Sequence, residues 1–341
     1  MPLHYQPNHP LLAHNSLGIP ARCHTYVEAH TPTQIRAACA HAHTQNLPIF
    51  VLGDGTNLVI AADYPGLVLR PRIGGIERLA ETANTVDLAI GAGENWHKFV
   101  RWTLEQNLHG LENLALIPGS CGAAPVQNIG AYGVELAPRV RWVEYIEIAS
   151  GQTTRRPAAD CQFSYRDSLF KGDLAGKVAI TRLALRLQKR FQPQTHYPAL
   201  AEFLADLPTP PSARQVFQAV CTIRRRKLPD PATTPNAGSF FQNPQILRPH
   251  YDQLRQHHPD LPGFPQTDGT IKIPAAWLID QLGWKGRQQN GIGIHARHAL
   301  ILTNPGHRRG PQVLEFAAQI AAAVRTAYGI DLKIEPHILT A

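Results

Sequence analysis

Residues 47–71 read LPIFVLGDGTNLVIAADYPGLVLRP, a stretch in which short apolar runs alternate with glycine turns. The run 49–52 is followed by Gly-Asp-Gly and then by apolar segments around Val59 and Leu67. Upstream, Thr31, Pro32 and Gln34 have the pattern of a helix start, with a capping residue, an early proline and a glutamine that completes a capping box. A helix followed by a buried strand and a glycine turn predicts an α/β unit.

The rest of the sequence predicts a β-rich middle part and an α+β C-terminal part. A strand, a turn and an amphipathic helix are expected over 86–106, and alternating apolar residues predict half-exposed strands at 141–149 and 177–188. Five prolines between Pro193 and Pro211 indicate a boundary with a short helix inside it. Further helices are expected at 212–228, opened by Ser212 and Gln215, and at 247–257, 274–282 and 311–329, with a last strand at 330–336. We therefore predict an α+β protein with parts at 1–72, 73–211 and 212–341.

The composition is that of a folded globular chain. Of the 341 residues, 43% are hydrophobic and 17% are charged, and no apolar run approaches the ~18 residues of a membrane helix. The N-terminus lacks the pattern of a signal peptide, and five scattered cysteines without a C-x-x-C pair predict reduced thiols. We expect a cytoplasmic protein with no membrane partner.

The net charge of +8 leaves two classes of anionic partner to consider. The basic residues are dispersed, and the longest run, Arg224–Lys227, is only four residues long, so we expect no nucleic-acid partner. A positive field also suits small polyanions such as nucleotides, and a general basic bias would give the same charge. The pair His295 and His298 lacks a carboxylate motif, so we expect no metal site.

Two glycine-rich segments are suited to binding phosphate. In GDGTN at 53–57 the backbone N–H groups, with Thr56 and Asn57, could hold a diphosphate, although a plain hairpin turn is the alternative. The G-x-G-x-x-G fingerprint is absent, because position 58 is leucine. Residues 110–136, GLENLALIPGSCGAAPVQNIGAYGVEL, form a loop too long to be purely structural and offer the amides of Gln127 and Asn128. Two such cradles suit a dinucleotide.

Charged residues outside these loops have more than one interpretation. Arg166 follows Tyr165 in an apolar stretch, where a salt bridge is the ordinary explanation. Arg224 and Lys227 lie in the last turn of their helix, where cations favour the helix dipole, and their spacing places them on one face that could meet a carboxylate or phosphate. Glu335 precedes a proline on the expected last strand, and by itself it indicates no function.

Five motifs stand in the order found in UDP-N-acetylenolpyruvoylglucosamine reductases, flavoenzymes of peptidoglycan synthesis. They are GDGTNL, LENLALIPGSCGAAPVQNIGAYGVEL, YRDSLFK, NAGSFFQNP and WLIDQLGWKG. The chain resembles these enzymes over roughly residues 15–337, and it resembles the longer type that has an extra tyrosine-bearing segment. Each motif is weak alone, but the ordered set is specific to the family.

The resemblance implies a two-subdomain FAD-binding fold of the vanillyl-alcohol-oxidase (PCMH) type over 1–72 and 73–211. Residues 212–341 would form a substrate domain whose last strand packs back near the active site. FAD would be held without a covalent bond by the two glycine segments, with Cys121 as a small apolar substitute for an aliphatic residue. The implied cofactor-binding residues are Gly53, Asp54, Gly55, Thr56, Asn57, Pro118, Gly119, Ser120, Cys121, Gly122, Gln127, Asn128, Gly130, Ala131 and Tyr132.

The resemblance also implies the reaction. UDP-N-acetylglucosamine enolpyruvate would be reduced to UDP-N-acetylmuramate, with NADPH as co-substrate and ping-pong hydride transfer through N5 of FAD. Arg166 would stabilise an enediolate, Glu335 would be protonated or share a proton, and Ser239 would protonate the carbon. Phe240 and Phe241 would anchor the loop that carries this serine. The implied substrate contacts are Tyr165, Tyr197, Arg224, Lys227, Asn243 and Gln288.

Two other functions stay open at this stage. One is a different flavin oxidoreductase or oxidase of the same fold, which would use O₂ in place of an enolpyruvyl acceptor. The other is a basic nucleotide- or nucleic-acid-binding module without catalysis, which would lack the yellow colour of a flavoprotein. We expect the protein to be a monomer.

Overall fold

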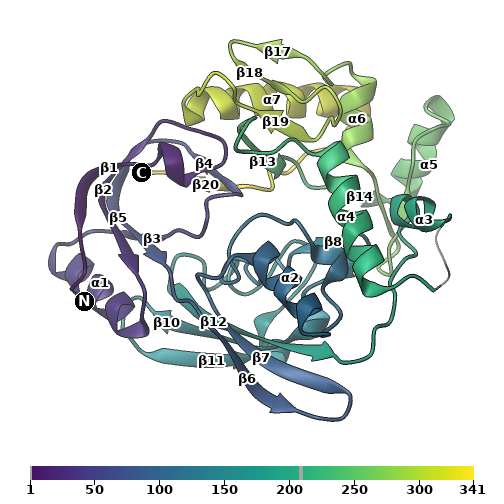
Figure 1. Ribbon diagram of the computed structural model, residues 1–341. Coiled ribbons are helices and arrows are strands. Elements are labelled where there is room, and N and C mark those ends of the chain that lie inside the picture. Colours follow the sequence, from purple (N-terminus) through teal and green to yellow (C-terminus); the bar gives the residue numbers. More distant parts are fainter. Residues whose placement is uncertain (1, 207–209) are drawn as a thin grey trace. The chain divides into compact units, whose positions relative to one another are not determined.

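The computed structural model describes residues 2–206 and 210–341 (Figure 1). The chain forms two compact units. Unit 1 comprises Met1–His9, Cys23–Asp54 and Pro65–Arg226, and unit 2 comprises Pro10–Arg22, Gly55–Tyr64 and Lys227–Ala341. The chain therefore passes between the units five times, once inside the GDGTN turn and once near the end of a helix.

The first sheet of unit 1 confirms the predicted α/β pattern. Its strands are ordered β1 (Gln6–Pro10), β2 (Arg22–Ala29), β5 (Tyr64–Pro71) and β3 (Ile49–Val51), and β3 runs parallel to β5. Helix α1 (Pro32–Thr44) begins where the capping pattern predicts, because the Thr31 hydroxyl accepts a hydrogen bond from the Gln34 N–H at 3.2 Å. The Gln34 side chain reaches one residue further back than a standard capping box and accepts from the N–H of His30.

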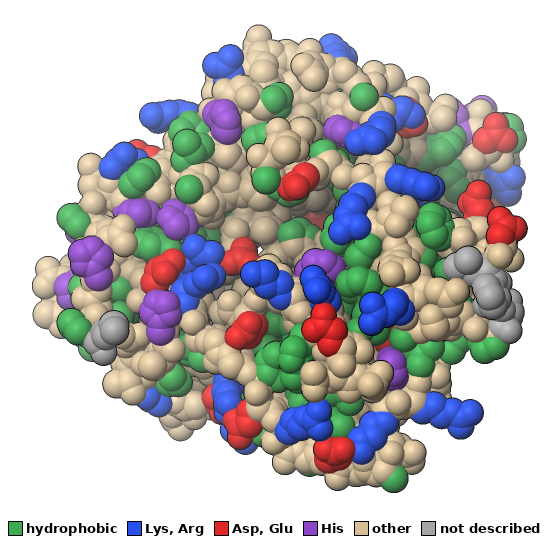
Figure 2. Space-filling view, in the orientation of Figure 1, with side chains coloured by type: hydrophobic (Ala, Val, Ile, Leu, Met, Phe, Trp, Pro, Cys, Tyr) green, Lys and Arg blue, Asp and Glu red, His purple; other side chains and the backbone are tan. Residues whose placement is uncertain are grey.

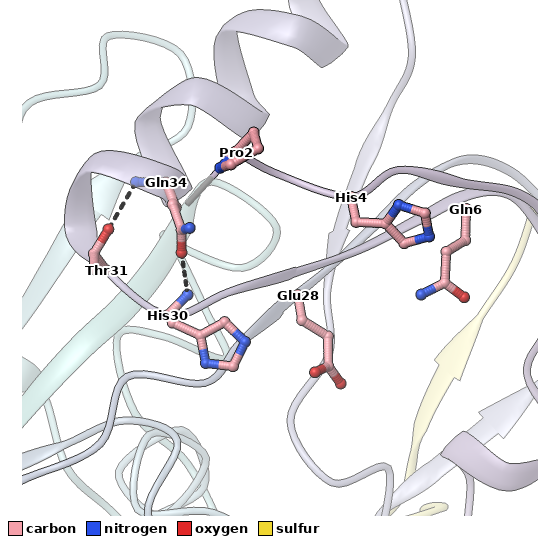
Figure 3. A pocket seen from close by; sticks show the side chains of 7 residues that line it. All are labelled: Pro2, His4, Gln6, Glu28, His30, Thr31 and Gln34. Carbon is pink, nitrogen blue, oxygen red and sulfur yellow. Dashed lines mark hydrogen bonds between the residues drawn. The ribbon is translucent and has the colours of Figure 1, made fainter.

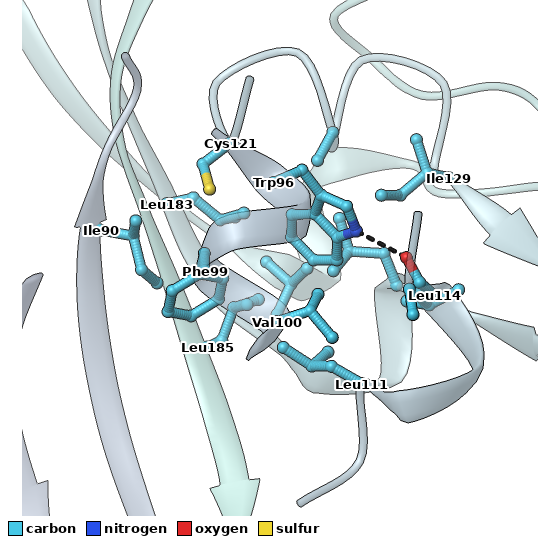
Figure 4. Packing of buried hydrophobic residues seen from close by; sticks show 14 of the residues in the cluster. Ile90, Trp96, Phe99, Val100, Leu111, Leu114, Cys121, Ile129, Leu183 and Leu185 are labelled. Atoms are coloured by element: carbon cyan, nitrogen blue, oxygen red, sulfur yellow. Dashed lines mark hydrogen bonds between the residues drawn. The ribbon is translucent and has the colours of Figure 1, made fainter. Parts of the chain in front are cut away.

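The second sheet of unit 1 is antiparallel. Its order is β11 (Thr153–Pro157), β10 (Val140–Glu147), β12 (Val178–Gln188), β7 (Thr85–Gly91) and β6 (Ile76–Glu81). Helix α2 (Trp96–Glu105) packs Trp96 and Phe99 onto it, close to Leu183 and Leu185 (Figure 4). The half-exposed alternation expected for 177–188 is wrong, because β12 is buried along most of its length. Both faces are covered at its start, where Val178 and Ile180 belong to the apolar cluster under α2 and Ala179 to the one under α1. Further along, Arg182, Arg186 and Gln188 are only partly buried.

Ion pairs cross the strands of this sheet. Arg182 pairs with Glu77, Arg186 with Asp87 and Lys189 with Glu81. Figure 2 shows Lys and Arg side chains next to Asp and Glu in the same region, and not gathered into one basic patch. These cations of the sheet are therefore matched by nearby carboxylates.

The remaining elements of unit 1 are short. The long glycine-rich segment consists of turns, a 3-10 helix η2 (Glu112–Leu114) and the pair β8 (Gly130–Ala131) and β9 (Val134–Glu135), followed by η3 (Ala137–Arg139). Later come η4 (Ala158–Cys161), α3 (Pro198–Leu204) and α4 (Ala213–Lys227). The start predicted for α4 is confirmed, because Ser212 and Gln215 exchange two capping hydrogen bonds of 2.8 and 3.3 Å.

Unit 2 is built on small sheets with helices. One sheet has the order β13 (Asn236–Ser239), β19 (Ile301–Thr303), β18 (Ile292–Ile294) and β17 (Gln288–Gln289), and another has β14 (Gln245–Leu247), β16 (Thr270–Lys272) and β15 (Phe264–Pro265). The helices are η1 (Leu12–His14), α5 (Arg248–His257), α6 (Ala275–Gln281) and α7 (Gly310–Tyr328). In the described part of the chain no helix combines the length and the apolar character that a bilayer span requires.

The last strand does not lie where the sequence predicts it. It is β20 (His337–Leu339), which pairs in parallel with β4 (Leu58–Ile60), and not residues 330–336. Over 333–335 the backbone makes only isolated contacts with the segment after Ser239, such as the Glu335 N–H to the Phe240 carbonyl at 2.9 Å. Glu335 therefore precedes the strand and is not part of it, and Pro336 separates the two.

Candidate functional site

The two glycine segments predicted to bind phosphate meet in unit 1. A side chain added at Gly53 would place its Cβ 3.3 Å from both the Ala123 Cβ and the Ser120 Oγ. Glycine at this position therefore lets the turn approach the second segment closely. The sequence predicted both cradles, and the structure brings them side by side.

The second segment is held firmly on the residues that precede α2. The Trp96 N–H donates to the Gly119 carbonyl at 3.0 Å, the Cys121 N–H to Glu94 at 2.8 Å, and the Gly122 N–H to Ala92 at 2.9 Å. A Cβ on Gly122 would lie 2.6 Å from the Ala92 Cβ, so this approach also requires glycine. The predicted cofactor loop is thus rigid at its centre.

Cys121 points into the core of unit 1 (Figure 4). Its side chain is fully buried, and burial raises the pKa of the thiol well above its usual range. A thiol in this state is a poor nucleophile. It fills space in the core, which agrees with the expectation that Cys121 is a small apolar substitute for an aliphatic residue.

The acid in the first glycine turn is paired. Asp54 Oδ1 lies 2.9 Å from Nη2 of Arg70 and 3.9 Å from Nη1 of Arg72. An unpaired carboxylate at this turn would repel a diphosphate. The two arginines offset that charge, so the turn can accept an anion on its backbone.

The unit 2 part of the same turn packs against the N-terminal segment. Gly55 has φ +63, and a Cβ there would lie only 2.0 Å from the His14 carbonyl oxygen. The Ser16 N–H donates to the Gly55 carbonyl at 3.0 Å, and the Ser16 carbonyl accepts from Asn236 at 2.9 Å. Thr56 and Asn57 complete the turn, and the Asn57 carbonyl accepts from His337 at 3.0 Å.

The hydroxyl of Ser16 is a buried, unsatisfied polar group. Its Oγ is buried and makes no hydrogen bond to any other described residue. Buried polar atoms almost always have a partner, so an orphan beside the turn predicted to bind phosphate fits a site that receives a phosphate-bearing cofactor. Sequence reasoning missed this residue, because nothing in the local pattern HNSLG distinguishes Ser16 from a turn serine.

The second half of the cofactor loop is shaped by Asn128. This side chain is 1% exposed; its Nδ2 donates to Glu135 at 2.9 Å and to the Ser164 carbonyl at 3.1 Å, and its Oδ1 accepts from Ala137 at 2.9 Å. Both amide hydrogens are therefore used within the protein. Any contribution to a cofactor comes through the shape of the loop, which Gln127, Gly130 and Ala131 continue.

Arg166 is held against this loop. Its Nη2 donates to the Gly130 carbonyl at 2.9 Å, and its guanidinium lies over the Tyr165 ring at 5.5 Å. The residue has φ +56, and the Lys171 ammonium donates to its carbonyl at 3.1 Å. The structure thus joins a predicted catalytic cation to the predicted cofactor loop.

Arg224 and Tyr132 lie in the same region of unit 1. The Arg224 Nε donates to the Leu116 carbonyl at 3.2 Å, and burial lowers the pKa of this arginine, with Tyr132 among the opposing groups. Leu116 is fixed in turn by its N–H, which donates to His97 Nδ1 at 3.0 Å. Tyr197 stands edge-on to Tyr132, with ring centroids 5.3 Å apart.

Ser239 and Glu335 come together in unit 2. Ser239 ends β13 after Gly238, which has φ +71. Phe240 and Phe241 are 0% and 1% exposed, and their burial confirms the expected anchor. Because the Glu335 N–H donates to the Phe240 carbonyl at 2.9 Å, the serine and the glutamate stand on adjoining backbone segments.

The other predicted substrate residues of unit 2 are spread out. The Asn243 Oδ1 accepts from the Ala275 N–H at 2.9 Å and so fixes the start of α6. Gln288 lies on β17 at the opposite edge of the sheet from Ser239, three strand spacings or roughly 14 Å away. Lys227 lies close enough to His298 to contribute, after burial, to lowering the pKa of that imidazole.

A separate cavity in unit 1 contains none of the predicted site residues. Its volume is about 410 Å³. Figure 3 shows its lining residues: Pro2, His4, Gln6, Glu28, His30, Thr31 and Gln34. Among the residues that the structure describes, no three His, Cys, Asp or Glu side chains are arranged to hold a metal ion, and this cavity is no exception.

Comparison with known proteins now decides the family. Residues 24–155 match the FAD binding domain family, and residues 230–339 match the family described as UDP-N-acetylenolpyruvoylglucosamine reductase, C-terminal domain. The enzyme of that name from Shewanella baltica (strain OS195) is 44% identical over 333 residues, which cover 98% of this chain and 96% of the relative. The enzyme from Burkholderia multivorans (strain ATCC 17616 / 249) is 45% identical over 336 residues, again 98% and 96%.

The chain belongs to the UDP-N-acetylenolpyruvoylglucosamine reductase family. A solved structure of the Thermus caldophilus member, 22% identical, matches it with a TM-score of 0.68 over 100% of both chains, which agrees in fold. The protein is therefore an FAD-dependent oxidoreductase of peptidoglycan precursor synthesis, with an FAD-binding domain of the PCMH type and a C-terminal domain of this family. Membership favours the reductase over both alternatives that the sequence left open.

Proposed function

We propose that the protein reduces UDP-N-acetylglucosamine enolpyruvate to UDP-N-acetylmuramate with NADPH, in two successive half-reactions, with Ser239 as the proton donor. FAD, when bound, supplies the hydride transfer, from the nicotinamide to the methylene carbon of the enolpyruvyl group. The observation that carries this proposal is the arrangement in unit 2. Ser239 follows a left-handed Gly238, precedes two fully buried rings, and adjoins the backbone of Glu335.

Arg166 has the role of stabilising negative charge. Hydride addition to the methylene carbon leaves charge on the neighbouring carbon, delocalised into the substrate carboxylate as an enediolate. A guanidinium already oriented by the Gly130 carbonyl at 2.9 Å can meet that charge without first reorganising. A fixed, permanently protonated fork suits this task better than a mobile lysine.

Glu335 and Ser239 complete the addition. An ionised carboxylate would repel the developing charge, so we propose that Glu335 is protonated or shares a proton in the reactive complex. The Ser239 hydroxyl then gives its proton to the carbon. A serine is a weak acid, and it serves only because the enediolate is strongly basic and the buried Phe240 and Phe241 fix the hydroxyl's position.

The remaining assignments follow from the family relationship and are proposals too. Residues 1–72 and 73–211 would hold FAD, and 212–341 would carry the substrate, in a cytoplasmic monomer. The cofactor residues would be those named from the two glycine segments, with Ser16 added because its buried hydroxyl lacks a partner among the described residues. The substrate would be bound by Tyr165, Tyr197, Arg224, Lys227, Asn243 and Gln288.

Substitution of Ser239 tests this proposal. We expect Ser239→Ala to slow reduction of the enolpyruvyl group by about 10²-fold or more, because general acid catalysis is lost. Loss of flavin absorbance on mixing with NADPH should keep its wild-type rate. Stopped-flow absorbance measures the two half-reactions separately. Thr233→Ala, which removes an exposed hydroxyl of the same unit, should change neither rate, and normal turnover by Ser239→Ala would reject the assignment.

A further inference from the structure

The segment 189–197 lies between β12 and α3 in unit 1 and contains no helix or strand. It contacts the rest of the unit at separate points. Phe191 packs against His109 with ring centroids 5.4 Å apart, and Tyr197 meets Tyr132 at 5.3 Å with the rings at 75°. Tyr197 is 42% exposed, so much of its ring faces solvent. The next helix is better anchored, because Leu200 and Leu204 lie in the core of the unit.

One buried amide connects this segment to the cofactor loop. Asn113 is 4% exposed, and its Nδ2 donates both to the Tyr132 carbonyl at 2.9 Å and to the Gln194 carbonyl at 2.8 Å. One of these carbonyls belongs to the loop proposed to bind FAD, and the other to the segment that ends at Tyr197. The amide therefore sets the spacing between two backbones that are remote in sequence.

The base of this connection is rigid. Asn113 lies in η2, where the Trp96 indole N–H donates to the neighbouring Leu114 carbonyl at 2.9 Å (Figure 4). Glu112, 3% exposed, accepts from the Gly110 N–H at 2.8 Å and so holds the other side of the turn. Because the donor is fixed, its two acceptors are the parts that would move if the bonds were lost.

The glycine after Tyr132 gives the segment room to lie close. Gly133 has φ +80, and a Cβ there would lie 2.9 Å from Nε2 of His196. The residue before Tyr197 thus packs directly over the end of the cofactor loop. The contacts of His196 and of Tyr197 with this loop depend on the same short distance that Asn113 sets.

We propose that Asn113 is a positioning residue, which ties the 189–197 segment to the cofactor loop and places Tyr197 against Tyr132, so that substrate affinity depends on it. The consequence for affinity rests on the proposed function, in which Tyr197 contacts the nucleotide substrate. The tether itself rests only on the contacts of unit 1. Asn113 acts through Tyr197, and it need not touch the substrate.

The test uses Asn113→Asp in the FAD-loaded enzyme. An aspartate has the same shape but can donate at most one hydrogen, and none when ionised, so at least one bridge is lost. We expect hydrogen exchange of peptides covering 189–197 to quicken about 10-fold, which corresponds to the loss of roughly 1.4 kcal/mol of hydrogen bonding. KM for the enolpyruvyl nucleotide should rise about 10-fold with kcat within about 2-fold, the pattern of lost binding that is uniform along the reaction.

Matched variants distinguish loss of the Asn113 hydrogen bonds to the 189–197 segment from a general destabilisation of η2. Trp96→Phe removes another buried hydrogen bond to the same turn, at Leu114, and should leave exchange in 189–197 unchanged. Asn113→Leu removes both donors without adding a charge, and it repeats the test if the aspartate variant folds poorly. Unchanged exchange in both Asn113 variants would overturn the proposal.

A double-mutant comparison with Tyr197→Ala decides the route to affinity. If Asn113 acts through Tyr197, Asn113→Asp should add nothing to KM once Tyr197 is alanine. Additive increases in KM would contradict that route. If Tyr197→Ala alone leaves KM at its wild-type value, the proposed substrate role of Tyr197 fails, whereas quicker exchange in Asn113→Asp still supports the tether.

Discussion

The hydroxyls of Ser239 and Ser16, both in unit 2, differ in their surroundings. Ser239 lies at the end of β13, which the buried Phe240 and Phe241 anchor. In the proposed reaction its hydroxyl has a role only when the substrate is bound. The Ser16 Oγ is buried without a partner among the described residues, although the Ser16 backbone bonds to Gly55 and Asn236. A fold that leaves one hydroxyl unsatisfied loses stability unless a ligand supplies the partner.

Replacement of Ser16 should therefore separate cofactor binding from folding. We expect Ser16→Ala to weaken FAD binding about 10-fold or more, because hydrogen bonds to charged groups contribute roughly 1.5–3 kcal/mol. The melting temperature of the flavin-free protein should not fall, because the substitution removes no hydrogen bond within the described chain. Flavin fluorescence on titrating the flavin-free protein with FAD gives the dissociation constant. Ser16→Thr keeps the hydroxyl and should bind normally, and an alanine variant that binds FAD as tightly as wild type would contradict the role.

At the scale of elements, close backbone approaches shape the cofactor loop. Gly53 lies against Ser120 and Ala123, and Gly122 lies against Ala92. These contacts join segments that are far apart in sequence, in a region where the loop has almost no regular secondary structure. Three backbone hydrogen bonds of 2.8–3.0 Å then hold the loop in place: the N–H groups of Cys121 and Gly122 donate to Glu94 and Ala92, and that of Trp96 donates to Gly119.

A single added methyl group at Gly122 should destabilise the protein. Its Cβ would lie 2.6 Å from the Ala92 Cβ and 3.1 Å from that residue's backbone, so the loop must shift. We expect Gly122→Ala to cost about 1–3 kcal/mol of unfolding free energy and to lower the flavin content of the purified protein. Urea denaturation and the ratio of flavin to protein absorbance measure the two effects. Gly172→Ala, where the nearest atom lies at 3.6 Å, is the control, and equal behaviour of the two variants would argue against the close-approach explanation.

The elements also show where sequence reasoning succeeds. Helix starts at Thr31 and Ser212 were predictable, because the capping hydrogen bond from the third helical residue involves only neighbouring residues. The prediction of a strand at 330–336 was wrong. The strand forms at His337–Leu339 because these residues pair with β4, which is distant in sequence. For the same reason the start of β12, residues 178–181, is buried on both faces although the sequence alternates.

For the whole molecule, the resemblance of five ordered motifs identified the family, and the chain's composition could not. The chain carries a net charge of +8, and some of its basic side chains pair with carboxylates, as Arg182 and Arg186 do on the large sheet of unit 1. Residues of the candidate site were predictable where a motif contained them, such as Arg166 and Ser239. Ser16 and Asn113 were not, because a buried orphan hydroxyl and a shared amide donor exist only in the folded chain.

The account depends on one sequence of events, in which NADPH gives its electrons to the flavin and the enolpyruvyl nucleotide then takes them. Anaerobic titration of the purified yellow protein tests this most directly. One equivalent of NADPH should remove the visible flavin absorbance, and one equivalent of UDP-N-acetylglucosamine enolpyruvate should then restore it and yield UDP-N-acetylmuramate. Absorbance that NADPH leaves unchanged, or that the nucleotide fails to restore, would contradict the proposed reaction.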